Sequence, residues 1–339
     1  MKLIKTEEAV GHVLCHDLTQ IIKDQYKDAR FRKGHVVTEE DIPVLLSMGK
    51  EHLYVWEMTP GMLHENDAAE RLYALCANAH MDRSEVKEGK IELKAACDGL
   101  FLVNSEKLIA VNTVEDIMIA TRKGGTAVRK GDKLAGMRVI PLIIPEEKLQ
   151  AAKQAAGDAP LLELKPWVRR TAAIVATGSE VKKGLIQDTF TPVVKDKLAA
   201  YGIETISIAY SGDGVENVAG AVAEARATGA DVILCTGGMS VDPDDNTPGG
   251  IKASGAKIVT YGAPVLPGAM FLLGYYEDGT PVMGLPGCVM YAGATIFDLV
   301  LPFVAADVPV KRQQIVALGE GGLCLGCKPC HWPICPFGK

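Results

Sequence analysis

The residues of this chain best suited to chemistry are carboxylates that follow apolar, strand-like runs. Glu180, Asp213 and Asp245 each come shortly after such a run, at residues 171–176, 203–208 and 231–235 respectively. In an open α/β sheet, ligands bind outside the carboxyl ends of the parallel strands. We therefore expect these three side chains to lie at one rim of a sheet, where they could act on a shared ligand.

The same loops are rich in glycine and in helix-start residues. Gly237 and Gly238 follow one apolar run, and Thr247 with Pro248 then marks the start of a helix. Glycine loops and helix N-termini bind phosphates through backbone N–H groups, and Mg²⁺ binds through a few protein oxygens plus substrate phosphates. Together these features predict a phosphorylated ligand held with Mg²⁺.

Each acidic residue, taken singly, also has a purely structural interpretation. Asp213 and Asp245 are typical turn or N-cap residues, and Glu180 suits the first turn of a helix, where the helix dipole favours a negative charge. The functional interpretation depends on all three meeting at one rim.

The elements that must position these residues follow from the order of apolar runs. Between residues 171 and 304, strand-like and helical runs alternate, which predicts an α/β fold with a doubly wound, mostly parallel sheet. Residues 271–276 and 281–285 flank an Asp-Gly turn and predict a hairpin. An apolar helix over 288–301 is expected to close this region.

The chain divides into four predicted regions. Residues 1–60 are expected to form a small α+β domain, with strand-like runs at 12–14 and 53–56 and a helix over 38–49. Residues 61–165 are expected to form an accessory, mostly β region with a linker, although 66–80 has a helical pattern. Residues 166–306 form the wound region, and 307–339 form a cysteine-rich tail.

Composition excludes several classes of protein. The 339 residues are 48% hydrophobic, and the net charge of −6 disfavours a general nucleic-acid or anionic-membrane binder. No run approaches the roughly twenty apolar residues of a membrane helix, and the first residues do not resemble a signal peptide. Five of the nine cysteines are scattered as in proteins of a reducing compartment, so we expect a cytoplasmic protein.

An ordered set of motifs carries a family resemblance over about residues 171–304. The motifs are TGSE (177–180), GLIQDT (184–189), SGDG (211–214), TGGMSV (236–241), DDNTP (244–248) and LPG (285–287). This set resembles the molybdenum-cofactor biosynthesis domain of molybdopterin adenylyltransferase and molybdopterin molybdenumtransferase. TGGMSV is more similar to the molybdenumtransferase, whereas DDNTP is more similar to the adenylyltransferase and to nicotinamide-nucleotide deamidase. Residues 31–49 also resemble a segment of the transferase.

The resemblance implies a ligand and a set of site residues. It implies binding of the phosphate-bearing pterin dithiolene, with Glu180, Asp213 and Asp245 supporting Mg²⁺ or molybdate as the catalytic residues. The implied ligand-binding residues are Thr177, Gly178, Ser179, Thr236, Gly237, Gly238, Ser240, Asp244, Thr247, Pro267, Gly268, Pro286 and Gly287.

Two positions depart from the transferase pattern. The usual Pro-Gly-Lys-Pro is PGAM at 267–270, which lacks the cation, and Cys288 stands where an asparagine usually follows LPG. Lys182, Lys183 and Lys252 could supply a replacement charge, or they could simply be solvated. Cys288 could be a reactive thiol or a molybdenum ligand, or it could be a small buried residue.

The tail carries a second motif of chemical interest. Cys324, Cys327, Cys330 and Cys335 form a CxxCxxCxxxxC array followed by proline. Such an array resembles half of a bacterial ferredoxin motif, which usually has three residues before its last cysteine, so it predicts an iron–sulfur cluster. Zn²⁺ held by four cysteines, or by three with His331, is the alternative.

Three functions are compatible with these observations. The first is a cofactor-biosynthesis enzyme that binds molybdopterin or adenylylated molybdopterin and inserts molybdate with release of AMP. The second is a non-catalytic molybdopterin-binding carrier, sensor or maturation factor, and the third is a nucleotide-cleaving enzyme like the deamidase. Expected partners are molybdopterin and molybdate, with a molybdoenzyme, another cofactor-biosynthesis protein or a second copy of the chain as further candidates; neither nucleic acid nor a membrane is expected.

Overall fold

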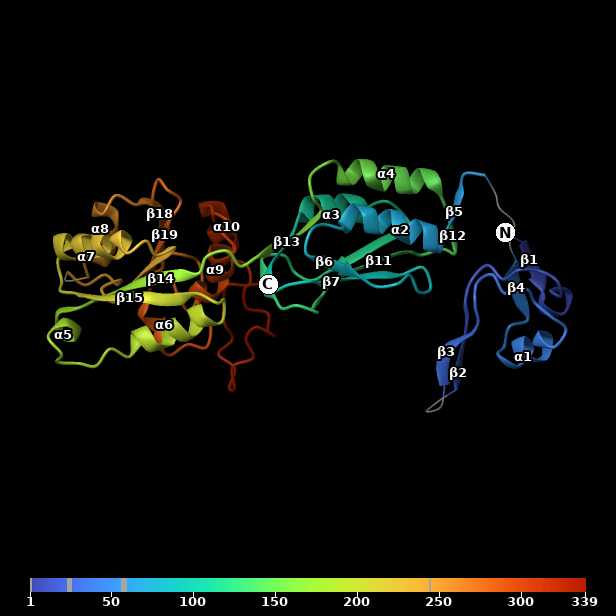
Figure 1. Cartoon of the computed structure of the whole chain (residues 1–339), viewed down its shortest axis with the longest axis horizontal. Coiled ribbons are helices and arrows are strands. Elements are labelled where there is room, and N and C mark those ends of the chain that lie inside the picture. The colour runs from blue at the N-terminus through green and yellow to red at the C-terminus, as the bar shows by residue number, and fades with distance from the viewer. Residues whose placement is uncertain (1, 23–25, 56–59, 244) are drawn as a thin grey trace. The chain divides into compact units, whose positions relative to one another are not determined.

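The computed structural model describes residues 2–22, 26–55, 60–243 and 245–339 (Figure 1). The chain forms two compact units. One comprises residues 1–96, 103–124 and 130–163, and the other comprises 97–102, 125–129 and 164–339. None of the helices in the described part of the chain is long and apolar enough to cross a membrane. The predicted boundaries at 60, 165 and 306 remain predictions.

The first unit begins with a small α+β substructure. Its elements are β1 (Lys2–Lys5), η1 (Thr6–Glu8), β2 (Leu18–Ile22), β3 (Tyr26–Phe31), α1 (Asp41–Ser47) and β4 (His52–Val55). The strands pair antiparallel as β1 with β4 and β2 with β3. The run 12–14, predicted as a strand, contributes only isolated bridges at Val13 and Leu14. The predicted strand at 53–56 corresponds to β4, and its last residue lies outside the described residues.

Helix α1 is shorter than the predicted helix over 38–49. The Asp41 carboxylate accepts hydrogen bonds from the Thr38 backbone N–H at 2.8 Å and from the Thr38 hydroxyl at 2.9 Å. These bonds hold a turn before the helix instead of a helical turn, so α1 begins at Asp41.

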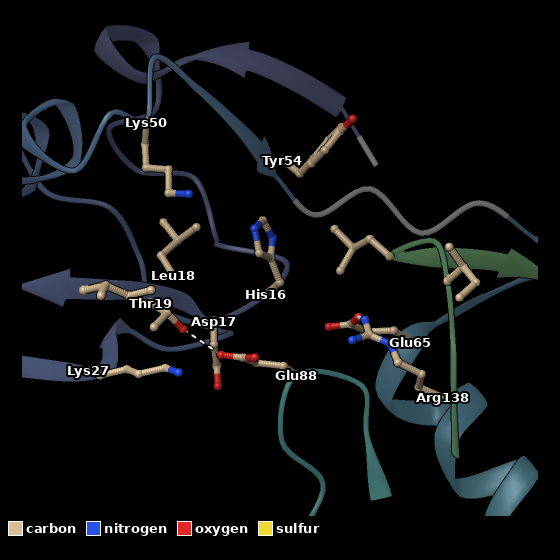
Figure 2. Close-up of a pocket in the computed structure, with 13 residues that line it drawn as sticks. His16, Asp17, Leu18, Thr19, Lys27, Lys50, Tyr54, Glu65, Glu88 and Arg138 are labelled. Atoms are coloured by element: carbon tan, nitrogen blue, oxygen red, sulfur yellow. Dashed lines mark hydrogen bonds and ion pairs between the residues drawn. The ribbon is translucent and has the colours of Figure 1, made fainter. Parts of the chain in front are cut away.

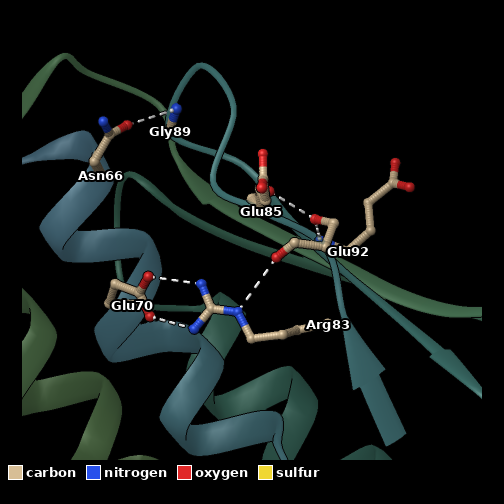
Figure 3. Close-up of polar contacts among 7 residues, drawn as sticks. Asn66, Glu70, Arg83, Glu85, Gly89 and Glu92 are labelled. Carbon is tan, nitrogen blue, oxygen red and sulfur yellow. Dashed lines mark hydrogen bonds and ion pairs between the residues drawn. The ribbon is translucent and has the colours of Figure 1, made fainter. Parts of the chain in front are cut away.

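The rest of this unit packs helices on an antiparallel sheet. The strands are β5 (Met62–His64), β6 (Met81–Arg83), β7 (Ile91–Ala95), β9 (Ile117–Thr121), β11 (Lys133–Val139) and β12 (Ile143–Pro145), and the helices are α2 (Glu65–Cys76), α3 (Ser105–Asn112) and α4 (Glu146–Ala156). The main sheet has the order β6-β7-β11-β9, and β12 pairs with β5. Figure 3 shows how α2 is joined to this sheet: both terminal nitrogens of Arg83 donate to the Glu70 carboxylate, at 2.8 and 2.7 Å.

The second unit contains the predicted wound module. A three-stranded sheet of β8 (Gly99–Val103), β10 (Thr126–Val128) and β13 (Leu162–Pro166) precedes it in the chain. The six-stranded sheet comprises β14 (Thr171–Thr177), β15 (Glu204–Ser211), β16 (Val232–Thr236), β17 (Lys257–Tyr261), β18 (Leu272–Tyr275) and β19 (Pro281–Leu285), in the order β15-β14-β16-β19-β18-β17. Strands β14, β15, β16 and β19 are parallel, and β18 is antiparallel to its neighbours.

Helices cover both faces of this sheet. They are α5 (Ser179–Lys182), α6 (Phe190–Ala199), α7 (Val215–Ala227), α8 (Thr247–Ala253), α9 (Ile296–Ala305) and α10 (Arg312–Ala317), with a 3₁₀ turn, η2, at Gly287–Met290. Successive β14 residues alternate between two cores: Ile174 packs with residues of α6 and α9, and Val175 packs with residues of α7. Figure 1 shows α7 and α8 together on one side of the sheet and α6 on the other. The α/β fold with a doubly wound, mostly parallel sheet is confirmed.

The predicted helix over 288–301 is wrong in its start. Residues 287–290 form η2, and α9 begins only at Ile296. Thr295 sets this start: its hydroxyl accepts from the Phe297 N–H at 3.2 Å, and the Asp298 carboxylate accepts from the Thr295 N–H at 2.8 Å. This reciprocal capping box satisfies N–H groups that would otherwise have no partner. The apolar run before it concealed the signal in the sequence.

This cap makes a stability prediction. Thr295→Ala removes a buried capping hydroxyl and should lower the free energy of unfolding by about 1–2 kcal/mol, the usual cost of losing a threonine cap. Urea unfolding followed by circular dichroism measures the change. Thr189→Ala is the matched control, because Thr189 is the N-cap of α6 and its side chain makes no capping hydrogen bond. Equal effects of the two substitutions would contradict the assigned role of Thr295.

Candidate ligand site at the carboxyl edge of the sheet

All the loops that carry the predicted site residues extend from one edge of the six-stranded sheet. The parallel strands β14, β15, β16 and β19 end at this edge. Strand β17 ends there as well, because it is antiparallel to β18, which is itself antiparallel to β19. The loops at this edge are 178–180, 212–213, 237–246, 262–271 and 286–287.

The loops after β14 and β15 are hydrogen-bonded to each other. The Ser179 N–H donates to Asp213 Oδ2 at 3.3 Å, and the Asp213 N–H donates to Ser179 Oγ at 3.4 Å. The Gly178 N–H also donates to the Ser211 carbonyl at 3.1 Å. Glu180 lies exposed in the first turn of α5, and Asp213 is half-buried. Two of the three predicted catalytic carboxylates are therefore carried by loops in direct contact.

Buried threonines join the β14 loop to the β16 loop. The Thr177 hydroxyl donates to the Thr236 carbonyl at 3.0 Å and lies 2.8 Å from the Thr247 hydroxyl. The Thr247 N–H donates to the Gly238 carbonyl at 3.1 Å. All three threonines are buried. Their hydroxyl and carbonyl groups thus hold the glycine turn at a fixed place between β14 and α8.

Gly237 is required where these two loops meet. Its φ of +83° is a conformation that other residues rarely adopt, and a Cβ built on it would lie 2.3 Å from the Thr177 carbonyl oxygen. The oxygen belongs to the backbone of β14 and cannot move aside without distorting the sheet. The side chain is therefore excluded by packing within the protein, and this packing brings the β16 loop close to β14.

Asp245 and Tyr261 shape the rest of the β16 loop. The Asp245 carboxylate accepts from the Ser240 N–H at 2.9 Å, and the Asp245 N–H donates to the Asp242 carbonyl at 2.9 Å. The Tyr261 hydroxyl, at the end of β17, donates to the Met239 carbonyl at 3.0 Å. Partial burial and the nearby charge of Asp245 raise the pKa of Tyr261, so its hydroxyl stays protonated. Asp244, a predicted ligand-binding residue, lies outside the described residues.

The remaining predicted residues lie near the start of α9. Gly268 packs so closely that a Cβ there would lie 2.5 Å from the Ile296 side chain, and the Ile296 N–H donates to the Pro267 carbonyl at 3.4 Å. Pro286 is buried and precedes η2, and Gly287 is exposed. These two Pro-Gly turns follow β17 and β19, on the side of β14 opposite to the Asp213 loop.

Sequence reasoning missed two features of the edge. Tyr261 is one, although its place as the last residue of a strand ending at this edge could have drawn attention to it. The other is the ion pair of half-buried Lys197 and buried Asp298, whose side chains are 2.5 Å apart. Lys197 also donates to the Gly293 carbonyl at 3.4 Å. These contacts fix the segment after Pro286 and Gly287 to α6 and α9. No motif marks a pair separated by about a hundred residues.

Lys182, one of the three lysines considered as replacement cations, lies beside the loop that carries Asp213. Its Cδ is 3.7 Å from the position of a Cβ built on Gly212, next to Asp213. Lys182, Lys183 and Lys252 are all exposed. Burial raises the pKa of Cys288, which keeps this half-buried thiol neutral.

The structure also contains a hollow of about 520 Å³ in the first unit (Figure 2). His16, Lys50, Glu65 and Arg138 are among the residues that line it. Burial lowers the pKa of His16 and raises that of Glu65, so burial favours the neutral form of both. These residues are widely separated in the sequence, and no motif indicated the hollow. Its lining mixes acidic and basic groups, which favours no single class of ligand.

Two parts of the chain match family models. Residues 173–306 match the family model described as "Probable molybdopterin binding domain", and residues 3–57 match a model described as a domain of unknown function. A CinA-like protein from Desulfosudis oleivorans is 40% identical over 86 residues, which cover 25% of this chain and 21% of that protein. The chain thus matches about a fifth of the length of that curated relative.

Solved structures of molybdenum-cofactor biosynthesis proteins are also similar to this chain, at low sequence identity. The molybdopterin biosynthesis enzyme MoaB from Thermus thermophilus is 19% identical with a TM-score of 0.32, covering 40% of this chain and 91% of that one. A molybdenum cofactor biosynthesis protein from Pyrococcus furiosus is 13% identical with a TM-score of 0.26, covering 91% of this chain and 64% of that one.

The close approach at Gly237 makes a prediction about the edge itself. Gly237→Ala forces a methyl group against the Thr177 carbonyl and should destabilise the module by about 1–3 kcal/mol, as overpacking does. Gly279→Ala is the matched control, because Gly279 has nearly the same φ, +82°, but open space around it. The difference in urea midpoint between the variants isolates the clash from backbone strain. If Gly279→Ala is destabilised as much as Gly237→Ala, the close contact with the Thr177 carbonyl is not what excludes a side chain at position 237.

Proposed function

We propose that the module at residues 173–306, which matches the molybdopterin-binding family model, binds molybdopterin or adenylylated molybdopterin at the carboxyl edge of its sheet. The proposed reaction is insertion of molybdate with release of AMP. Glu180, Asp213 and Asp245 are the proposed carboxylates of the site, with the glycine loops contacting the phosphate.

The observation that carries this proposal is the direct hydrogen bonding among loops from three neighbouring parallel strands. Ser179 joins the β14 loop to Asp213 of the β15 loop, and Thr177 joins it to Thr236 and Thr247 around the β16 loop. Acidic side chains and glycine-rich backbone are thereby carried by one connected set of loops. A connected set can act on a single ligand, whereas the same residues on separate surfaces could not.

The donor set suits Mg²⁺ that is bound together with a ligand phosphate. Among the described residues, no three His, Cys, Asp or Glu side chains form a group that could hold a metal ion alone. Mg²⁺ typically binds through one or two carboxylates and completes its shell with water and substrate phosphates. Asp213 fits this role, because its half-buried carboxylate has two oxygens and the Ser179 N–H engages one of them.

Backbone amides, carboxylates and a lysine of the chain have different roles in the proposed reaction. Backbone N–H groups of the glycine turn would stabilise phosphate oxygens, and the carboxylates would hold the cation that neutralises the developing negative charge. Bound Mg²⁺ would act as a Lewis acid on the phosphate. Lys182, beside the Asp213 loop, could replace the lysine missing from PGAM at 267–270. No side-chain nucleophile is required.

Two alternatives have specific support. The missing lysine at 267–270 and Cys288 in place of asparagine favour a non-catalytic carrier or sensor of molybdopterin, because binding tolerates these changes more readily than catalysis does. The DDNTP motif at 244–248, which resembles that of nicotinamide-nucleotide deamidase, favours a nucleotide-cleaving enzyme. The first proposal accounts for the larger number of motifs.

One experiment separates the three functions. The full chain is incubated with adenylylated molybdopterin, molybdate and Mg²⁺, and AMP and the metal-containing cofactor are quantified. In a parallel incubation it receives nicotinamide mononucleotide, and ammonia is quantified. AMP release with cofactor formation supports the proposed reaction. Tight binding without AMP release contradicts catalysis and supports the carrier. Release of ammonia from nicotinamide mononucleotide, without pterin binding, would support the third function.

Amide substitutions test whether the carboxylates act through charge. Asp213→Asn and Asp245→Asn keep a hydrogen-bond acceptor for the N–H groups of Ser179 and Ser240 but remove the negative charge. If the carboxylates hold Mg²⁺, each variant should lose at least about tenfold in Mg²⁺-dependent affinity for adenylylated molybdopterin, measured by titration calorimetry. Asp196→Asn, an exposed substitution on α6, is the control. Full affinity in both site variants would mean that these aspartates only shape their turns.

A further inference from the structure

The C-terminal tail forms a closed loop that is attached to the wound module. The Gly338 N–H donates to the Gly321 carbonyl at 2.9 Å, so the two ends of the segment 321–338 meet. Next to this closure, the Leu266 N–H donates to the Gly322 carbonyl and the Cys324 N–H donates to the Leu266 carbonyl, both at 2.8 Å. All four tail cysteines lie inside this closed segment, which we call the thiol loop (residues 321–338).

Apolar packing holds both ends of the thiol loop. Phe337 is 2% exposed and belongs to the core under α9, and the Trp332 ring packs edge-on against it with ring centroids 5.7 Å apart. Cys324 and Cys335 are half-buried and pack against the same core. The first and last cysteines of the array are therefore anchored to the folded module.

The two middle cysteines lie on an exposed turn between these anchors. Residues 325–331 are all exposed, Cys327 and Cys330 among them. All four tail cysteines are free thiols, and among the described residues no three potential ligands form a group that could hold a metal ion. Bringing Cys327 and Cys330 toward the anchored pair moves mainly exposed residues, so little buried apolar area is lost. Closure of the loop further lowers the entropic cost of gathering the four thiols.

We propose that Cys324, Cys327, Cys330 and Cys335 together bind one metal centre through thiolates, an iron–sulfur cluster or Zn²⁺. Each thiol that becomes a ligand releases its proton to solvent, so that four thiolates hold the centre. The CxxCxxC spacing followed by a Cys-Pro pair favours the iron–sulfur cluster. Zn²⁺ is the alternative centre for the same four thiolates. The four cysteines are not among the proposed ligand-binding residues, and the proposal does not depend on the reaction proposed at the ligand edge.

The metal centre is coupled to the Pro267 and Gly268 turn through the backbone. Leu323 of the thiol loop forms a parallel bridge with Leu266, the residue immediately before this turn. A centre that fixes Cys324 also fixes the hydrogen bonds on both sides of Leu266. Metal binding should therefore slow hydrogen exchange at the Leu266 and Cys324 amides, because exchange requires local opening of this pairing.

Metal analysis of the full chain tests the proposal. The protein is purified anaerobically, and iron, sulfide and zinc are quantified per chain, before and after reconstitution with iron and sulfide or with Zn²⁺ alone. One centre per chain is expected. Visible absorption that reductant bleaches identifies the cluster, and zinc without sulfide identifies Zn²⁺. Absence of a stoichiometric metal in both arms overturns the proposal.

Single substitutions assign the metal to the thiol loop. Cys327→Ser and Cys330→Ser change exposed residues, so the fold should survive, and each should weaken metal binding at least about tenfold. Cys97→Ser, outside the tail, is the control and should keep the full metal content. Cys327→Ser and Cys330→Ser should lose both the metal and the protection of the Leu266 amide from hydrogen exchange, whereas Cys97→Ser should keep both. Full metal content in both tail variants, with the fold intact by circular dichroism, would place the metal elsewhere and overturn the assignment.

Discussion

The wound module depends on the contact between the end of β14 and the turn that follows β16. Thr177 takes part with both its carbonyl and its hydroxyl: the carbonyl leaves room only for a glycine at position 237, and the hydroxyl bonds to Thr236 and lies against that of Thr247. These groups are buried, so leaving any of them without a partner would be costly. Because these contacts hold the turn at residues 237 and 238, they also fix the position at which the acidic part of the β16 loop leaves the sheet.

The sequence predicted this edge well because each of its parts leaves a local signal. Alternating strand and helix patterns indicated the sheet and its parallel strands, and parallel strands necessarily end at one edge. The placement of Glu180 and Asp213 on contacting loops follows from strand order alone, since β14 and β15 are neighbours. The motifs added a family resemblance, and residues 173–306 match the family model described as "Probable molybdopterin binding domain".

What the sequence could not predict are contacts between residues far apart in the chain. The pairing of Lys197 with Asp298 and the bond from Tyr261 to the β16 loop depend on how helices and strands pack, which no local pattern encodes. The start of α9 was missed for a different reason. The apolar run around residue 289 hid the capping box at Thr295, and a capping box is visible only if the helix start is already suspected.

The charges of the edge constrain any ligand that binds there. The described carboxylates lie on loops with one nearby lysine, Lys182, and the lysine usual in the Pro-Gly turn is absent at 269. A phosphorylated ligand entering such a site meets like charges, and at short range in a partly dry site this repulsion is large. Backbone N–H groups alone can bind a phosphate, but they cannot also neutralise neighbouring carboxylates. In the proposed site, a divalent cation bound by phosphate and carboxylate together would remove both repulsions at once.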